Sequence, residues 1–229
     1  MSNHIIIYSH GFGVRADNRG MFTEIAAQFP AAEHIIFDYN KIDKAKKTVT
    51  VTPLDEQAKM LTDIFNQAKQ DNPTAIIDII THSQGGTIAA MAQLDARRTI
   101  LLAPPLQILN SGDKVRYYLE HRPGAVVTDD MATIPRRDGT TTIIGADYWR
   151  SYNKIPDLTP LCNELAKLTK LTILVATEDE VVDEQDYSGL ADDVKLIEIR
   201  SDHNFKDTAR QEMIDIVKGI IDEPTSKKR

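Results

Sequence analysis

Hydrophobic residues in this chain gather into short, β-branched runs separated by longer amphipathic stretches. A short run that is apolar almost throughout predicts a strand covered on both faces, as in a parallel sheet. Such runs lie at residues 4–10, 34–39, 74–80, 98–102, 171–176 and 194–200. Between them, apolar residues recur at intervals of three and four, the spacing of a helix with one buried face. The alternation predicts an α/β fold with a mostly parallel sheet and helices on both faces.

The stretch at residues 54–68 illustrates how one of these helices is expected to begin and pack. Its apolar stripe consists of Leu54, Ala58, Leu61, Phe65 and Ala68. Thr52 and Pro53 precede it, which predicts a hydroxyl at the cap and a proline at the first helical position. Further helices are expected at residues 21–29 and 87–94, from about residue 158, and around 213–221.

One connection is far longer than the few residues that usually join strands and helices in such folds. About fifty residues separate Pro105 from Leu158. They include an expected helix at 114–121 and an Asp138-Gly139 pair between two β-branched runs, which predicts a hairpin with a two-residue turn. We therefore expect a small α+β insertion that contains a β-hairpin.

Composition narrows the class of protein. A chain of 229 residues with 41% hydrophobic content suits a single domain, 1–229. The net charge of −7 argues against a nucleic-acid partner. No run approaches the roughly 18 apolar residues that span a membrane, and an expected first strand at His4 leaves no room for a signal peptide, so we expect a cytoplasmic protein without a membrane partner.

Cys162 is the one cysteine and cannot form an internal disulfide. The four lysines within residues 41–47 are expected in a solvated loop.

The residues with candidate chemistry begin with Thr81-His82-Ser83-Gln84-Gly85-Gly86, between an expected strand and an expected helix. A serine becomes a useful nucleophile when a sharp turn projects its hydroxyl towards a base. Gly85 and Gly86 provide the small residues that such a turn needs. Thr81 departs from the usual Gly-x-Ser-x-Gly pattern, which places the tightness of the turn in question.

Three further signals also follow strands. His10-Gly11-Phe12-Gly13 is a glycine-containing turn after the first strand, where main-chain N–H groups can face a developing negative charge. Asp179 comes shortly after the strand at 171–176, and His203 follows the last strand. The order along the chain is therefore Ser, Asp, His.

With these four motifs in this order, the chain resembles the α/β-hydrolase family over nearly its whole length. The resemblance implies that Ser83 is the nucleophile, His203 the general base and then acid, and Asp179 the group that orients the imidazole. It implies further an oxyanion hole formed by the N–H groups of Phe12 and Gln84, a cap at about 106–157, and no metal or cofactor. The supporting residues of this site are His10, Gly11 and Gly85.

Several assignments remain open at this level. Glu178, Asp183 and Asp186 lie near Asp179 and are alternative acids. The insertion is rich in aromatic residues; Tyr117, Tyr148 and Trp149 either line a substrate pocket or pack the insertion onto the main sheet. Its arginines Arg136, Arg137 and Arg150 are expected to be exposed. His82 is expected to be structural, and Asp78, within an apolar strand, must be hydrogen-bonded or protonated if it is buried.

The activity that follows is hydrolysis of a small-molecule carboxylic ester through an acyl-enzyme, as in a carboxylesterase. A thioesterase or amidase with the same triad is an alternative. A second alternative is a protein of this fold that binds a ligand and does not catalyse a reaction. The sequence does not determine the oligomeric state or the acyl group.

Overall fold

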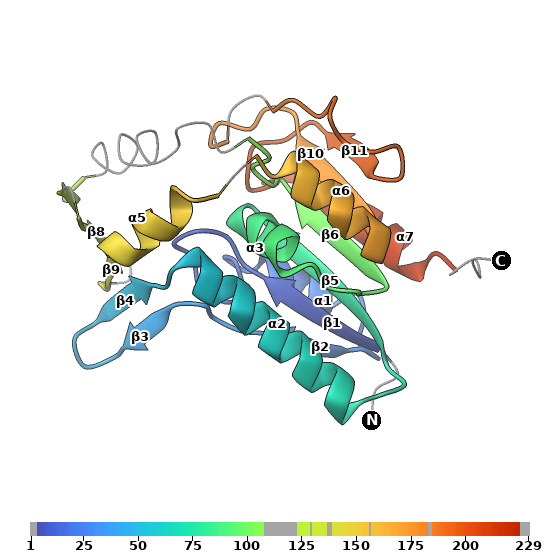
Figure 1. Ribbon diagram of the computed structural model, residues 1–229, viewed down its shortest axis with the longest axis horizontal. Coiled ribbons are helices and arrows are strands. Elements are labelled where there is room, and N and C mark those ends of the chain that lie inside the picture. Colours follow the sequence, from blue (N-terminus) through green and yellow to red (C-terminus); the bar gives the residue numbers. More distant parts are fainter. Residues whose placement is uncertain are drawn as a thin grey trace.

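A six-stranded sheet forms the centre of the protein (Figure 1). The computed structural model describes residues 4–107, 123–128, 130–136, 139–155, 157–182 and 185–224. The strands are β1 (His4–Ser9), β2 (Glu33–Ile36), β5 (Ile76–His82), β6 (Arg98–Leu102), β10 (Lys170–Ala176) and β11 (Lys195–Ile199). Their order is β11-β10-β6-β5-β1-β2, and every neighbouring pair is parallel. The predicted parallel α/β sheet is thus confirmed, with its carboxyl ends along one edge.

Helices cover both faces of this sheet because alternate strand residues point to opposite sides. Ile5 and Ile7 of β1 pack with α2 (Leu54–Asp71), α3 (Gln84–Ala92) and α6 (Thr159–Leu168). Ile6 and Tyr8 pack with α1 (Met21–Ala26) and α7 (Thr208–Asp222) on the other side. The apolar stripe predicted for α2 is buried in the first of these two cores.

A second, smaller sheet joins two distant parts of the chain. Its order is β3-β4-β9-β8-β7, from β3 (Lys41–Asp43) and β4 (Thr48–Val51) through β9 (Thr141–Ile144) and β8 (Ala132–Pro135) to β7 (Val126–Val127). β4 and β9 pair in parallel, and the other neighbours are antiparallel. The expectation of a solvated loop at 41–47 holds for residues 44–47, which form the turn of a β-hairpin, and for the four exposed lysines, but it is wrong for residues 41–43, which are strand β3. β3 pairs with β4, and β4 in turn pairs with β9 of the insertion.

The hairpin predicted within the insertion is present as β8 and β9. Its turn is longer than the two residues expected, because the Arg136 N–H donates to the Thr140 carbonyl, which leaves three residues between them. Gly139 is the last of these, and its φ of 77° is left-handed, which glycine adopts without strain. The expected helix at 114–121 lies outside the described residues.

Helix α5 (Ala146–Tyr152) follows the small sheet and lies beside the start of α2. Ser151 Oγ accepts a hydrogen bond of 2.9 Å from the Leu54 N–H and so caps α2 from outside. The capping role predicted for Thr52 is wrong, since its hydroxyl donates instead to the Tyr39 carbonyl. The two ends of the insertion meet where the Leu158 N–H donates to the Leu106 carbonyl at 2.9 Å.

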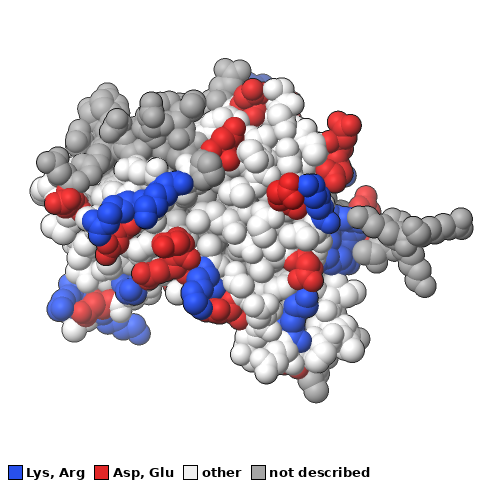
Figure 2. Space-filling view, viewed as in Figure 1, with Lys and Arg blue, Asp and Glu red and all other residues white. Residues whose placement is uncertain are grey.

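Charged side chains of both signs are mixed over the face seen in Figure 2. Many are paired, as Lys59 is with Asp63 on α2 and Lys167 with Glu164 on α6. Such exposed pairs contribute little to stability. Among the described helices, none has both the length and the apolar character needed to cross a bilayer.

Candidate active site

Ser83 occupies a sharp turn between β5 and α3. Its backbone angles are φ 53° and ψ −125°, a conformation that L residues adopt only under strain. The Ser83 N–H donates to the Leu102 carbonyl of β6, and its own carbonyl accepts from the Gly86 N–H, both at 2.8 Å. The turn is thereby held by the sheet on one side and by the first turn of α3 on the other.

Close contacts with Ser9 and Pro104 explain the glycines at 85 and 86. A Cβ atom on Gly85 would lie 2.0 Å from the Ser9 carbonyl oxygen, and one on Gly86 would lie 2.8 Å from Cβ of Pro104. Thr81 has no such contact to avoid, because it remains in β5, paired with Ser9 and Leu101. The departure from the glycine pattern at Thr81 therefore leaves the turn intact. Its cost is a buried hydroxyl without a hydrogen-bond partner among the described residues.

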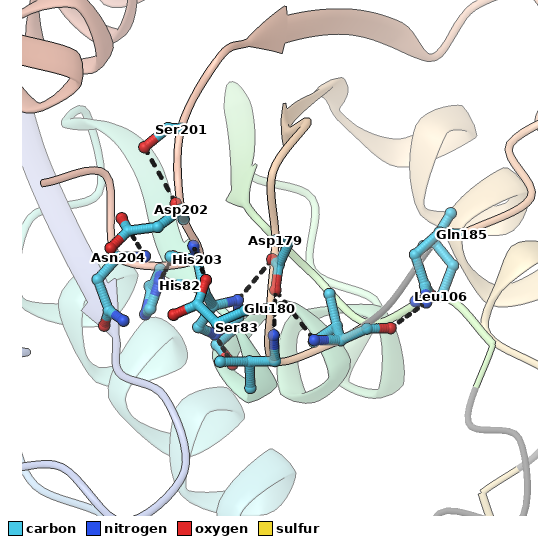
Figure 3. Close-up of polar contacts among 12 residues, drawn as sticks. His82, Ser83, Leu106, Asp179, Glu180, Gln185, Ser201, Asp202, His203 and Asn204 are labelled. Atoms are coloured by element: carbon cyan, nitrogen blue, oxygen red, sulfur yellow. Dashed lines mark hydrogen bonds and ion pairs between the residues drawn. The ribbon is translucent and has the colours of Figure 1, made fainter.

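The side chains of Ser83, His203 and Asp179 form a continuous hydrogen-bonded line (Figure 3). Nε2 of His203 lies 2.9 Å from Ser83 Oγ, and its Nδ1 lies 2.6 Å from Asp179 Oδ2. The Asp179 carboxylate can only accept, so Nδ1 carries the proton and Nε2 is the acceptor for the serine hydroxyl. The three predicted residues come from loops after β5, β10 and β11, at the carboxyl edge of the sheet, where open α/β folds place their sites.

The loop after β10 keeps Asp179 ionised. Burial acts to raise the pKa of this carboxyl, but the hydrogen bond and charge of His203 and the N–H groups of Val182 and Val181 outweigh it, so the pKa is lowered. Those two N–H groups donate to Oδ1 at 2.9 and 2.8 Å. Oδ2 is left to face His203.

Of the alternative acids, Glu178 is exposed and pairs with Arg200, and Asp186 accepts from the Ser188 N–H. Neither contacts the His203 ring in the part of the chain that the structure describes. Asp183 lies outside the described residues. The structure thus brings Asp179 to His203, as the sequence predicted.

Two residues hold the main chain of His203. Its N–H donates to Glu180 Oε2 at 3.1 Å, and its carbonyl accepts from His82 Nε2 at 2.8 Å. Burial, followed by the nearby charge of His203, lowers the pKa of His82 to about 3, so this imidazole is neutral. The sequence did not predict either contact, because no local pattern links residue 82 or residue 180 to residue 203.

The turn after β1 lies against the turn at Ser83. A Cβ atom on Gly11 would be 3.2 Å from Ser83 Cβ, tighter than ordinary van der Waals contact, so the two turns approach closely here. His10 accepts from the Tyr39 N–H through Nε2 at 3.0 Å and donates from Nδ1 to the Gly11 carbonyl at 2.9 Å. His10 and Gly11 therefore lie in the turn that carries Phe12, against the turn at Ser83.

The insertion contacts this same turn. Arg136 donates to the Gly13 carbonyl and, at 3.1 Å, to Thr142 Oγ1. The expectation that Arg136 is exposed is therefore wrong, because its guanidinium bridges the small sheet and the turn. Arg150 is exposed as expected, beside Asp147. Arg137 lies outside the described residues.

Tyr148 of α5 contacts both residues assigned to the oxyanion hole. Its hydroxyl donates to Gln84 Oε1 at 2.6 Å, and its ring lies 5.3 Å from that of Phe12, between centroids. Gln84 donates in turn to Gln57 of α2 at 3.0 Å. Trp149 is buried with its ring edge-on to Tyr148. Tyr148 thus joins the insertion to the turns at Ser83 and Phe12, and Trp149 packs beside it within the insertion. Tyr117 lies outside the described residues.

Asp78, for which the sequence suggested no function, is fully buried within β5. It accepts from His4 at 2.8 Å and from two nitrogens of Arg97, one of them at 2.9 Å. Burial acts to raise its pKa, but these hydrogen bonds and charges lower it overall. Asp78 therefore ties together strands at the amino-terminal edge of the sheet, the edge opposite Ser83. Within the described residues, no group of three or more His, Cys, Asp or Glu side chains is placed to hold a metal ion.

The sequence and the fold were compared with those of known proteins. No protein-family model matches the sequence, and no curated protein sequence does. Among solved structures, Est1E from Butyrivibrio proteoclasticus with ferulic acid bound aligns with a TM-score of 0.70 and 17% identity, over 95% of this chain and 87% of that one.

Two further structures are similar in the same way. The monoacylglycerol lipase of Paleococcus ferrophilus aligns with a TM-score of 0.65 and 13% identity, over 95% of this chain and 93% of that one. The alpha/beta hydrolase GrgF from Penicillium sp. sh18 aligns with a TM-score of 0.65 and 14% identity, over 95% and 88%. The chain therefore has the α/β-hydrolase fold.

Proposed function

We propose that this protein is a serine hydrolase that cleaves carboxylic esters of small molecules through an acyl-enzyme. The observation that carries the proposal is the hydrogen-bonded line from Ser83 Oγ through His203 to Asp179. A serine on a strained turn, with an imidazole acceptor at 2.9 Å, has the geometry of an activated nucleophile. The strain keeps its hydroxyl clear of the main chain.

In the first half of the reaction, Ser83 Oγ attacks the ester carbonyl while His203 Nε2 takes the hydroxyl proton. Asp179 stabilises the imidazolium that forms. The N–H groups of Phe12 and Gln84 receive the developing oxyanion. The bond between the carbonyl carbon and the alcohol oxygen then breaks, and His203 gives its proton to the departing alcohol. The products are a free alcohol and an ester of Ser83.

In the second half, water replaces the alcohol. His203 removes a proton from the water, whose oxygen attacks the acyl carbon, and the bond to Ser83 Oγ breaks. The proton returns to Ser83, and a carboxylic acid leaves. His203 thus acts as base and acid in turn, and no further reactant is needed.

The neighbouring structures support an ester as the substrate. The Rhodothermus marinus neighbour is called an esterase domain and the Paleococcus protein a monoacylglycerol lipase, and Est1E has ferulic acid bound. Thioester and amide hydrolysis would use the same triad. Ester hydrolysis is preferred because these names point to ester bonds. A ligand-binding protein without catalysis is disfavoured by the intact hydrogen bond between Ser83 and His203.

The test compares wild type with Ser83→Ala on p-nitrophenyl esters of increasing acyl length, beside matching thioesters and amides. We expect turnover of the esters and a loss on the order of 10⁶ in kcat for the variant. A fluorophosphonate probe should label wild type and leave Ser83→Ala unlabelled. Equal activity in the two proteins would exclude Ser83 as the nucleophile, and absent labelling of wild type would favour the ligand-binding alternative.

A further inference from the structure

His82 lies between the turn at Ser83 and the loop that carries His203. It ends β5, directly before the serine, and its side chain is only 3% exposed. Its ring lies 4.9 Å from the His203 ring, at an angle of 53° between the planes. Figure 3 shows the two imidazoles side by side at the same end of the site. The catalytic cycle proposed above gives His82 no chemical step.

The hydrogen bond of His82 determines which of its nitrogens carries the proton. The partner of Nε2 is a carbonyl oxygen, which can only accept, so Nε2 holds the hydrogen. Nδ1 is then an unprotonated acceptor, and it has no hydrogen-bond partner among the described residues. It faces Gly11, where a Cβ atom would lie 3.3 Å away. A histidine kept in this state is a neutral donor.

The main chain of His203 is held on both sides of its Cα atom. Glu180 accepts from its N–H, and His82 donates to its carbonyl. A ring attached to a Cα held in this way has little freedom beyond its two side-chain torsions. Its nitrogens are then directed to Asp179 and Ser83. The second of these contacts is the one that must stay short for proton transfer.

We propose that His82 is a positioning residue, whose Nε2–H holds the carbonyl of His203 so that the catalytic imidazole stays in line between Ser83 and Asp179. The inference rests on the proposed function of that triad. A neutral donor suits this place, because His203 becomes an imidazolium during the reaction and a cation beside it would oppose that charge. Burial lowers the pKa of His82 to about 3, so its imidazole is neutral at pH 7.

Two substitutions separate the hydrogen bond from packing. His82→Gln keeps an N–H donor about as far from Cβ as Nε2 of histidine, whereas His82→Met has similar length and no donor. We expect His82→Gln to retain kcat within a few fold and His82→Met to lose about 10- to 100-fold in kcat at nearly constant KM, because a displacement of about 1 Å can cost this much. Ester hydrolysis and the rate of fluorophosphonate labelling give the readouts.

A spectroscopic measurement follows His203 without any substrate. The short hydrogen bond from Nδ1 to Asp179, 2.6 Å, should give a low-field proton resonance. We expect this resonance to persist in His82→Gln and to shift or broaden in His82→Met. If wild type hydrolyses no ester and takes no label, the proposed function fails, while the resonance still tests the role of His82.

His34 provides the matched control. His34 lies on the edge strand β2, and its Nε2 also donates to a main-chain carbonyl, that of Phe29, at 2.9 Å. His34→Gln and His34→Met should differ in thermal stability and share the kcat of wild type. The positioning role is overturned if His82→Gln and His82→Met have equal kcat and equal resonances, or if both lose activity alike, since the effect would then come from the ring and not from its donor.

Discussion

The Tyr148 hydroxyl donates a hydrogen bond of 2.6 Å to Oε1 of Gln84, the residue that follows Ser83. Tyr148 belongs to α5, within the long insertion, and both side chains are buried. The same tyrosine ring packs against the ring of Phe12, the other residue assigned to the oxyanion hole. One side chain of the insertion thus touches both segments whose N–H groups are proposed to stabilise the oxyanion.

Tyr148→Phe should therefore affect catalysis as well as stability. Removing the hydroxyl leaves Gln84 Oε1 buried without this donor, which costs about 1–2 kcal/mol in the free energy of unfolding. The freed side chain relaxes the turn at Gln84, so we expect kcat to fall about 10-fold with KM little changed. Urea unfolding and steady-state kinetics measure the two effects.

Tyr8→Phe is the control for this change. Its hydroxyl lies 3.1 Å from His34 Nδ1, in the core on the other face of the sheet. We expect a comparable loss of stability with an unchanged kcat. If Tyr148→Phe keeps full kcat while losing stability, the contact with Gln84 serves packing alone.

Asp179→Asn tests the choice of acid. An asparagine can donate to Nδ1 of His203 and so favours the wrong tautomer, in which Nε2 carries the proton and cannot accept from Ser83. We expect a loss of about 10⁴ in kcat with the fold retained, measured on the best ester substrate. Glu178→Gln, beside it, should change kcat little, because Glu178 pairs with Arg200 at the surface. A mild effect of Asp179→Asn would point to another acid.

Gly85→Ala should be strongly destabilising. The new methyl group would lie 2.0 Å from the Ser9 carbonyl oxygen, so either β1 or the turn must move. We expect a loss of at least about 3 kcal/mol in the free energy of unfolding, above the usual range for overpacking, and a displaced Ser83 that no longer labels with a fluorophosphonate.

Gly219→Ala gives the opposite outcome for the same chemical change. Gly219 lies in α7 with no atom within 4 Å of the added Cβ. Alanine is the better helix former there, by about 0.5–1 kcal/mol. Thermal unfolding of both variants provides the comparison, and a Gly85→Ala protein as stable as wild type would contradict the close contact with Ser9.

Asp78→Asn should reduce stability in a way that depends on pH. The folded pKa of Asp78 is below its unfolded value of about 3.9, so its ionised form stabilises the fold fully above that pH, and the contribution is lost as the pH falls through the folded pKa. We expect a deficit of about 3 kcal/mol at pH 7 that narrows towards pH 3, measured by urea unfolding.

Asp63→Asn is the matched control, since Asp63 pairs with Lys59 on the exposed face of α2. Its effect should stay within about 0.5 kcal/mol at either pH. A deficit for Asp78→Asn that is the same at pH 7 and pH 3 would show that the carboxylate charge contributes nothing and that shape alone matters.

Apolar periodicity and turn residues are local properties, and they were enough to predict the central sheet, its helices and the order of Ser83, Asp179 and His203 along the chain. Three contacts could be found only in the folded chain: β4 pairs with β9, Arg136 donates to the Gly13 carbonyl, and His82 donates to the carbonyl of His203. Each of these contacts joins residues about 90 or more positions apart. Such contacts depend on how distant segments pack against one another, and the spacing of residues within one segment does not show which other segment it will contact.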